Sequence, residues 1–132
     1  MENNIALEWK VIEKFIQKDK RDRYKQFVAK EKTRPKFIRD LAHFRYLEME
    51  KFDRIEGGGE ELRILERLKK SKIDTSTCYI ISQNSRLDTK TLETIAALKD
   101  TIGLGMGTIL VFGDADIIYF EGEEAFDRLI SK

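Results

Sequence analysis

The sequence has few of the residues that usually build covalent or metal sites: among 132 residues there is one cysteine and one histidine. The single cysteine, Cys78, excludes an internal disulfide, and the single histidine, His43, excludes a metal site built from several histidines. The two lie far apart in the sequence, and nothing in their surroundings supports a Cys–His catalytic pair. We therefore expect no metal, no cofactor and no catalytic residue.

Long apolar runs are also missing. The longest, Ile109–Phe112 and Ile117–Phe120, have the length of strands and fall far short of the roughly 18 residues that cross a bilayer. The first residues, Met-Glu-Asn-Asn, lack the basic and then apolar layout of a secretory signal. These absences predict a cytoplasmic protein without a membrane partner.

Charge, in contrast, is abundant and unevenly distributed. Charged residues make up 37% of the chain, against about a quarter in typical domains. Residues 1–51 carry a net charge of +5, and residues 52–132 carry −4. Since a chain of this length usually forms one domain, we expect a single domain over residues 1–132. In it, a basic helical arm (residues 1–43) packs on or projects from a body (residues 44–132).

Apolar spacing predicts helices in the arm. Apolar residues recur every three or four positions over 5–16 and again over 24–28, as they do on one face of a helix. The stretch 17–23 between them has no apolar residue, which allows either one long helix or two helices with a break near 18–20. Pro35 suits the first turn of the next helix, where its missing N–H has no helical partner to lose.

The body combines helices and strands. Residues 43–59 fit neither period cleanly, so we expect an irregular segment there, with a short strand near 52–55 and a glycine loop. Apolar runs on both sides of Gly113-Asp114-Ala115 predict a hairpin. A strand is predicted at 78–81. Three helices are predicted as well: one at 62–68, one that begins after an N-cap at Asp88 and ends near residue 99, and one at 125–130. This order predicts an α+β fold with a small, mostly antiparallel sheet of three to four strands and helices on one face.

Four motifs in the chain resemble a family of small uncharacterised bacterial proteins. They are Lys36-Phe37-Ile38 with Leu41 and His43, Cys78-Tyr79-Ile80-Ile81-Ser82, Gly105-Met106-Gly107-Thr108-Ile109-Leu110, and Tyr119-Phe120-Glu121-Gly122-Glu123. The resemblance covers residues 36–124, about two-thirds of the chain, and leaves most of the basic arm outside. It implies an α+β fold and no particular activity.

A polar loop (82–88) and a glycine turn (103–108) are candidates for ligand binding. Glycines allow backbone N–H groups to approach an anion closely. This turn, however, follows a helix and leads into a strand, the reverse of the order in nucleotide-binding loops, so a helix C-cap also explains it. The candidate ligand-binding residues are His43, Ser82, Asp88, Gly105, Gly107, Thr108 and Glu121.

The basic arm gives the stronger indication of a partner, because residues 14–39 contain 11 basic residues against three acidic ones. Such a surface attracts phosphate backbones by releasing counterions, and it also suits an acidic protein or a second copy of the chain; a merely solvated helix face is the simplest alternative. The candidate contact residues are Lys18, Lys20, Arg21, Arg23, Lys25, Lys30, Lys32 and Arg34.

Two hypotheses for function follow. The first is a non-enzymatic binding or interaction module that uses the basic helices to contact nucleic acid, an acidic protein or a second copy in a homo-oligomer. The alternative is a small-ligand-binding protein or enzyme that uses the polar loop and the glycine turn. This alternative requires their candidate residues to converge on one pocket.

Overall fold

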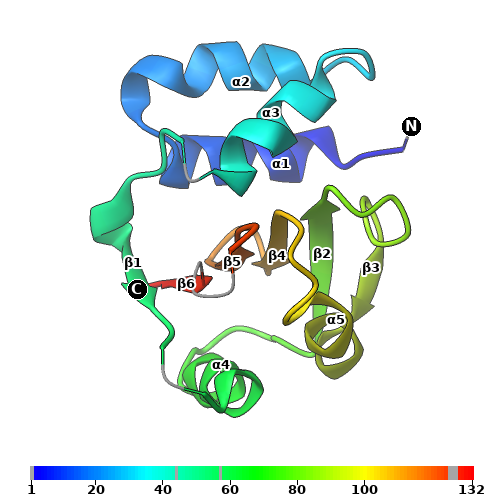
Figure 1. Ribbon diagram of the computed structural model, residues 1–132. Helices are drawn as coiled ribbons and strands as arrows, with labels where there is room; N and C mark the ends of the chain where they lie inside the picture. The colour runs from blue at the N-terminus through cyan, green and yellow to red at the C-terminus, as the bar shows by residue number, and fades with distance from the viewer. Residues whose placement is uncertain (1, 44, 57, 125–127) are drawn as a thin grey trace.

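The helices and strands of the protein were obtained from a computed structural model, which describes residues 2–43, 45–56, 58–124 and 128–132. Three helices come first and six strands follow, with two further helices between them (Figure 1). The elements are α1 (Ile5–Phe15), α2 (Arg21–Val28), α3 (Arg34–Ala42), β1 (Phe52–Arg54), α4 (Glu60–Lys69), β2 (Thr77–Ser82), β3 (Thr91–Glu93), α5 (Thr94–Thr101), β4 (Thr108–Phe112), β5 (Ile117–Glu121) and β6 (Arg128–Ser131), with short 3₁₀ turns at Lys18–Lys20 and Met49–Lys51. None of the described helices is long and apolar enough to cross a membrane.

All six strands belong to one sheet in the order β1-β6-β5-β4-β2-β3, and each neighbouring pair is antiparallel. The predicted hairpin is confirmed, since β4 pairs with β5 from Thr108↔Glu121 to Phe112↔Ile117. The predicted short strand near residue 52 is also confirmed, as β1, whose partner is β6. The α+β class is therefore right, but three to four strands were too few.

Helices cover both faces of the sheet, with α1–α3 on one side and α4 and α5 on the other (Figure 1). Strand β4 shows why: Ile109 and Val111 pack in the core under α1–α3, whereas Leu110 and Phe112 pack in the core with α4 and α5. Successive side chains of a strand point to opposite faces, so a run of consecutive apolar residues needs a cover on each side. The prediction of helices on one face is wrong.

Of the two alternatives that the sequence left open for the arm, the structure has two helices with a break that includes residues 18–20. Helix α1 ends at Phe15, and Ile16 is extended before the 3₁₀ turn that leads into α2. Pro35 lies in the first turn of α3, as expected. Tyr24 and Val28 of α2 are buried in the same core as residues of the sheet, so the arm packs on the body.

Two local predictions are wrong. Asp88 does not cap a helix, because the short strand β3 follows it and α5 begins only at Thr94. The predicted terminal helix is also absent at Arg128–Ser131, which is strand β6; residues 125–127 lie outside the described residues. Within β6, Leu129 and Ile130 are buried in the two different cores. A strand places neighbouring residues on opposite faces, which a helix would not do.

Candidate functional site

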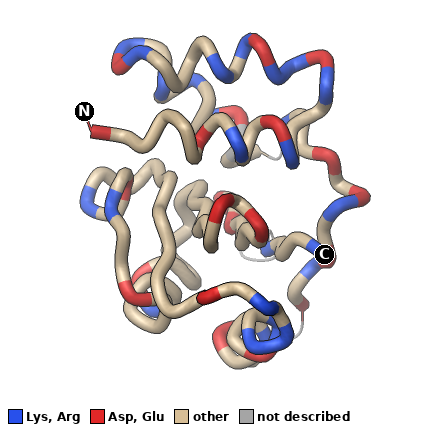
Figure 2. Tube along the Cα trace, turned by 180° about the vertical axis from the view of Figure 1, so that it is seen from behind, with Lys and Arg blue, Asp and Glu red and all other residues tan. Residues whose placement is uncertain are grey.

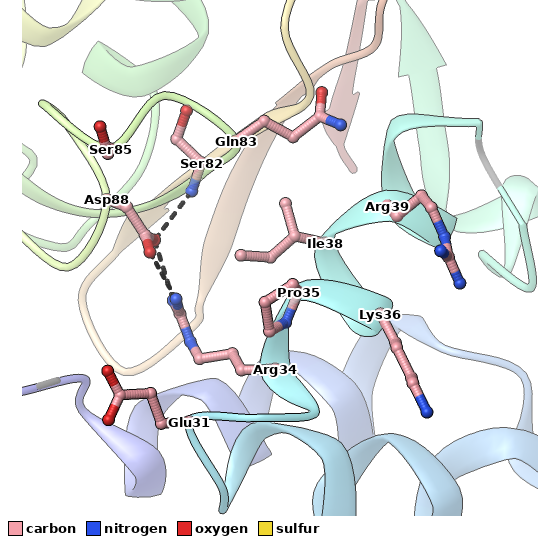
Figure 3. Close-up of a pocket in the computed structure, with 10 residues that line it drawn as sticks. All are labelled: Glu31, Arg34, Pro35, Lys36, Ile38, Arg39, Ser82, Gln83, Ser85 and Asp88. Carbon is pink, nitrogen blue, oxygen red and sulfur yellow. Dashed lines mark hydrogen bonds and ion pairs between the residues drawn. The ribbon is translucent and has the colours of Figure 1, made fainter.

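An open pocket of about 600 Å³ lies between α3 and the loop after β2 (Figure 3). Ligand pockets typically measure about 300 to 1,000 Å³, so it has room for a small molecule. One side comes from the arm, namely α3 and Glu31 just before it, and the other comes from the polar loop. The lining residues are Glu31, Arg34, Pro35, Lys36, Ile38 and Arg39, together with Ser82, Gln83, Ser85 and Asp88.

A buried ion-pair network forms one wall of this pocket. The guanidinium of Arg34 lies between two carboxylates. Its Nε and Nη2 donate to Glu8 at 3.0 and 2.8 Å, respectively. Its Nη2 also donates to Asp88 at 2.9 Å, and its Nη1 donates to the other oxygen of Asp88. The Glu8 side chain is 0% exposed, and that of Arg34 is 3% exposed. Tyr79 also donates from its hydroxyl to Glu8 Oε2 at 2.7 Å. The network therefore connects α1, the first residue of α3, β2 and the polar loop.

The network keeps Arg34 charged. Burial alone would lower the pKa of Arg34, but the hydrogen bonds to Asp88 and Glu8 outweigh it and raise that pKa above its ordinary value. Burial, helped by the bond to Glu8, likewise raises the pKa of Tyr79, which stays neutral. In this network one guanidinium thus lies between two carboxyl groups.

Asp88 also organises the polar loop. Its Oδ1 accepts a hydrogen bond from the backbone N–H of Ser82 at 3.0 Å. The hydroxyls of Ser82 and Thr108 lie 2.8 Å apart in a hydrogen bond across strands β2 and β4, and Ser82 Oγ accepts from the N–H of Asn84 at 3.0 Å. The polar side chains of the loop thus mostly bond backbone N–H groups of the same loop, as in an Asx-type turn.

Gln83 connects the pocket with the glycine turn. Its Oε1 accepts from the N–H of Gly107 at 2.7 Å, and its Nε2 lies 3.5 Å from Glu123 Oε1. His43 Nε2 lies 3.9 Å from the same Glu123 oxygen. A Cβ on Gly107 would lie 2.6 Å from the Cβ of Ala42, so this glycine permits close packing of the turn against the end of α3.

Glu121 belongs to a second buried cluster. Its Oε1 accepts from the Tyr119 hydroxyl at 2.9 Å and from Arg128 Nε at 3.1 Å, and its Oε2 accepts from the N–H of Gly103 at 3.1 Å. Burial raises the pKa of Glu121, against the opposing effect of the bonds from Tyr119 and Arg128. This cluster anchors the start of the glycine turn and does not line the pocket.

The ligand-binding candidates therefore gather at one end of the sheet, with two of them in the pocket itself. Ser82 and Asp88 line it, and Gly107 and Thr108 contact lining residues. His43 and Glu121 lie farther away. Gly105 adopts a left-handed conformation with φ +75°, and a Cβ there would lie 3.7 Å from the carbonyl oxygen of Glu123.

The basic candidates of the arm fall into several environments, and along α2 (Figure 2) the one acidic residue among the cations is Asp22. Arg34 is buried, which removes it as a surface contact. Arg21 pairs with Glu48 at 2.8 Å, and Lys25 pairs with Glu13. Lys20 and Arg23 lie over the rings of Tyr46 and Phe27, while Lys18, Lys30 and Lys32 are exposed.

Sequence reasoning did not assign Glu8, Gln83, Lys36 and Arg39 to a site. Glu8 had a signal, because it lies on the apolar face of α1 between Ile5 and Ile12, where a charged residue needs a buried partner. Lys36 and Arg39 were visible only as part of the basic run. Their place beside the polar loop depends on how α3 packs on the sheet.

Comparisons of the chain with protein-family models, curated proteins and solved structures found no match. The resemblance to the bacterial family stays a prediction. Function therefore has to be argued from the geometry of the site.

Proposed function

We propose that this protein is a non-enzymatic binding protein whose ligand places an anionic group in the pocket between α3 and the polar loop. The observation that carries the proposal is the position of Lys36 and Arg39. Both are exposed, both line the pocket, and within the described residues neither forms an ion pair with a carboxylate. A carboxylate or phosphate bound there would gain charge-assisted hydrogen bonds from one or both.

The remaining walls suit the rest of such a ligand. Pro35 and Ile38 give an apolar surface between the charged side chains, and the exposed Ser85 offers a hydroxyl from the loop opposite (Figure 3). A pocket with an apolar wall and a few placed polar groups is typical of small-molecule sites. The proposal joins the basic arm and the polar loop in one site.

The hydrogen bonds of the pocket favour binding over a reaction. A nucleophilic serine needs an adjacent base. Ser82 Oγ instead bonds with Thr108 and the N–H of Asn84, and the guanidinium of Arg34 is shared between Glu8 and Asp88. These groups hold the walls of the pocket in place.

Titration with hexanoate at low salt, followed by ¹H–¹⁵N NMR, tests this proposal. We expect the shifted amides to cluster at residues 34–39 and 82–88. We expect Arg39→Gln and Lys36→Gln each to weaken binding several-fold, with about tenfold corresponding to the loss of 1.4 kcal/mol. Lys69→Gln, an exposed cation of α4 on the other side of the sheet, is the matched control. Shifts outside the pocket, or binding unaffected by both pocket variants, would contradict the proposal.

A second candidate function is contact with an extended anionic partner such as a single-stranded nucleic acid. It is favoured by the exposed cations outside the pocket, Lys18, Arg23, Lys30 and Lys32. Binding of an oligonucleotide should then weaken steeply between 50 and 200 mM salt, about one power of salt concentration for each phosphate contacted. Affinity that does not change with salt would exclude it.

A further inference from the structure

We infer that the anionic ligand of the pocket carries an aromatic ring, which lies in a second cleft beside Phe27. The inference rests on the proposed function, which places the anionic group of the ligand at Lys36 and Arg39. It adds the chemical class of the rest of the molecule, an aryl-substituted acid. Lys36 belongs to both places and connects them.

The second cleft lies at the end of α2 and in the loop before α3. It is open and measures about 290 Å³, and cavities of about 150 Å³ already hold benzene. The half-buried ring of Phe27 forms part of its wall. The other lining residues are Gln26, Ala29, Lys30 and Thr33. The cleft therefore has room for one aromatic ring.

Lys36 connects this cleft with the pocket. Its side chain lines the pocket, and its Nζ lies over the ring of Phe27, 5.6 Å from the ring centroid. In Figure 3 this side chain runs away from the polar loop. The backbone N–H of Lys36 also donates to the carbonyl oxygen of Thr33, a residue of the cleft, at 3.0 Å. A carboxylate that accepts a hydrogen bond from the Lys36 ammonium is therefore only a short chain away from Phe27.

The cleft favours an aromatic ring over an alkyl group because cations surround it. Arg23 lies over the same Phe27 ring at 5.3 Å, and the exposed Lys30 lines the cleft. Among the described residues, none of the side chains of Arg23, Lys30 and Lys36 forms an ion pair with a carboxylate. The face of a ligand ring is negative and attracts these cations, and the ring also pairs with that of Phe27. A saturated group of the same size gains only the burial of its apolar surface.

Two acids of equal charge and similar size, 3-phenylpropionate and 3-cyclohexylpropionate, isolate the contribution of the ring. In ¹H–¹⁵N NMR titrations at low salt, we expect 3-phenylpropionate to bind about fivefold more tightly or better, from its aromatic and cation–π contacts. We also expect it to shift the amides of residues 26–33 in addition to those of the pocket.

Two variants test whether the preference arises in this cleft. Phe27→Leu removes the ring, and Arg23→Gln removes a cation over it; each should lower the ratio of the two affinities at least twofold. Lys20→Gln is the matched control, because Lys20 lies over the ring of Tyr46, at 4.9 Å, and does not line the cleft. This control should keep the ratio of wild type.

Equal affinity for the two acids would overturn the aromatic inference and leave the proposed function standing. The same holds for a preference that neither Phe27→Leu nor Arg23→Gln changes. If these acids and hexanoate all fail to shift residues 34–39 and 82–88, both the inference and the proposed function are wrong.

Discussion

Replacing Arg34 by methionine should destabilise the protein far more than any surface substitution. Methionine keeps most of the buried volume and removes the charge and the four hydrogen bonds to Glu8 and Asp88. Among the described residues, Glu8, which is 0% exposed, then keeps the Tyr79 hydroxyl and the Asn3 side-chain amide as its side-chain donors. A buried carboxylate without a counter-charge is costly, because its charge has lost its hydration and has no ionic partner in exchange.

Breaking a buried ion pair by removing one partner costs about 3 to 5 kcal/mol. The upper half of this range applies, because Arg34 serves two carboxylates and is itself almost wholly buried. With a urea slope of about 1.5 kcal/mol per M, the midpoint of unfolding should fall by roughly 3 M. Since whole domains are stable by about 5 to 15 kcal/mol, this variant should be close to its limit of stability.

Urea unfolding followed by circular dichroism at pH 7 measures the effect. The triple variant Glu8→Gln, Arg34→Met, Asp88→Asn, which carries no charge in the network, should recover part of the loss, and Arg39→Met on the same helix should cost less than 1 kcal/mol. A loss below 1 kcal/mol for Arg34→Met would show that the buried carboxylates do not depend on Arg34.

Three further substitutions or treatments test other parts of the structure. Burial raises the pKa of Glu121 in the folded state, so the contribution of Glu121 to stability is complete below pH 4.5 and is lost as pH rises. Urea unfolding from pH 4 to 7 should therefore show wild type losing stability relative to Glu121→Gln. The opposite trend would contradict this. Burial raises the pKa of Cys78 to about 12, so a disulfide reagent at pH 8 should label the native thiol on the order of a thousandfold more slowly than the thiol in urea; equal rates would contradict its burial. Gly107→Ala should cost about 1 to 3 kcal/mol because the new methyl meets Ala42 at 2.6 Å; unfolding of this variant in urea with an unchanged midpoint would contradict that packing.

Elements defined by neighbouring residues were predictable from the sequence. The hairpin around Gly113-Asp114-Ala115 combines two apolar runs with a turn, and both signals lie within a few residues. Strand β6 was not predicted because its conformation depends on pairing with β1 and β5. Arg54 pairs with Leu129 from one side, and Phe120 pairs with Leu129 from the other. No local pattern in 125–130 carries that information, and tertiary pairing overrides local propensity.

Only one side of the candidate site, the polar loop, was predictable from the sequence. Ser82 and Asp88 stood out because a polar loop follows a buried strand, and they do line the pocket. Arg34 looked like one more cation in a basic run, and its burial depends on Glu8 and Asp88, which lie 26 residues before it and 54 after it. The opposite wall of the pocket comes from α3, which the sequence assigned to a separate arm.

The pairing of β1 with β6 also affects how the chain can fold during its synthesis. Phe52 lies opposite Ser131, and β1 is an edge strand with β6 as its one neighbour in the described sheet. On a translating ribosome, residues 52–54 therefore have no strand to join until residues 128–131 have emerged. Until then β5 has β4 as its one neighbour in the described sheet, and its other edge is open to chaperones and to other nascent chains. Residues 128–131 are thus the segment that joins the edge strand β1 to the rest of the sheet.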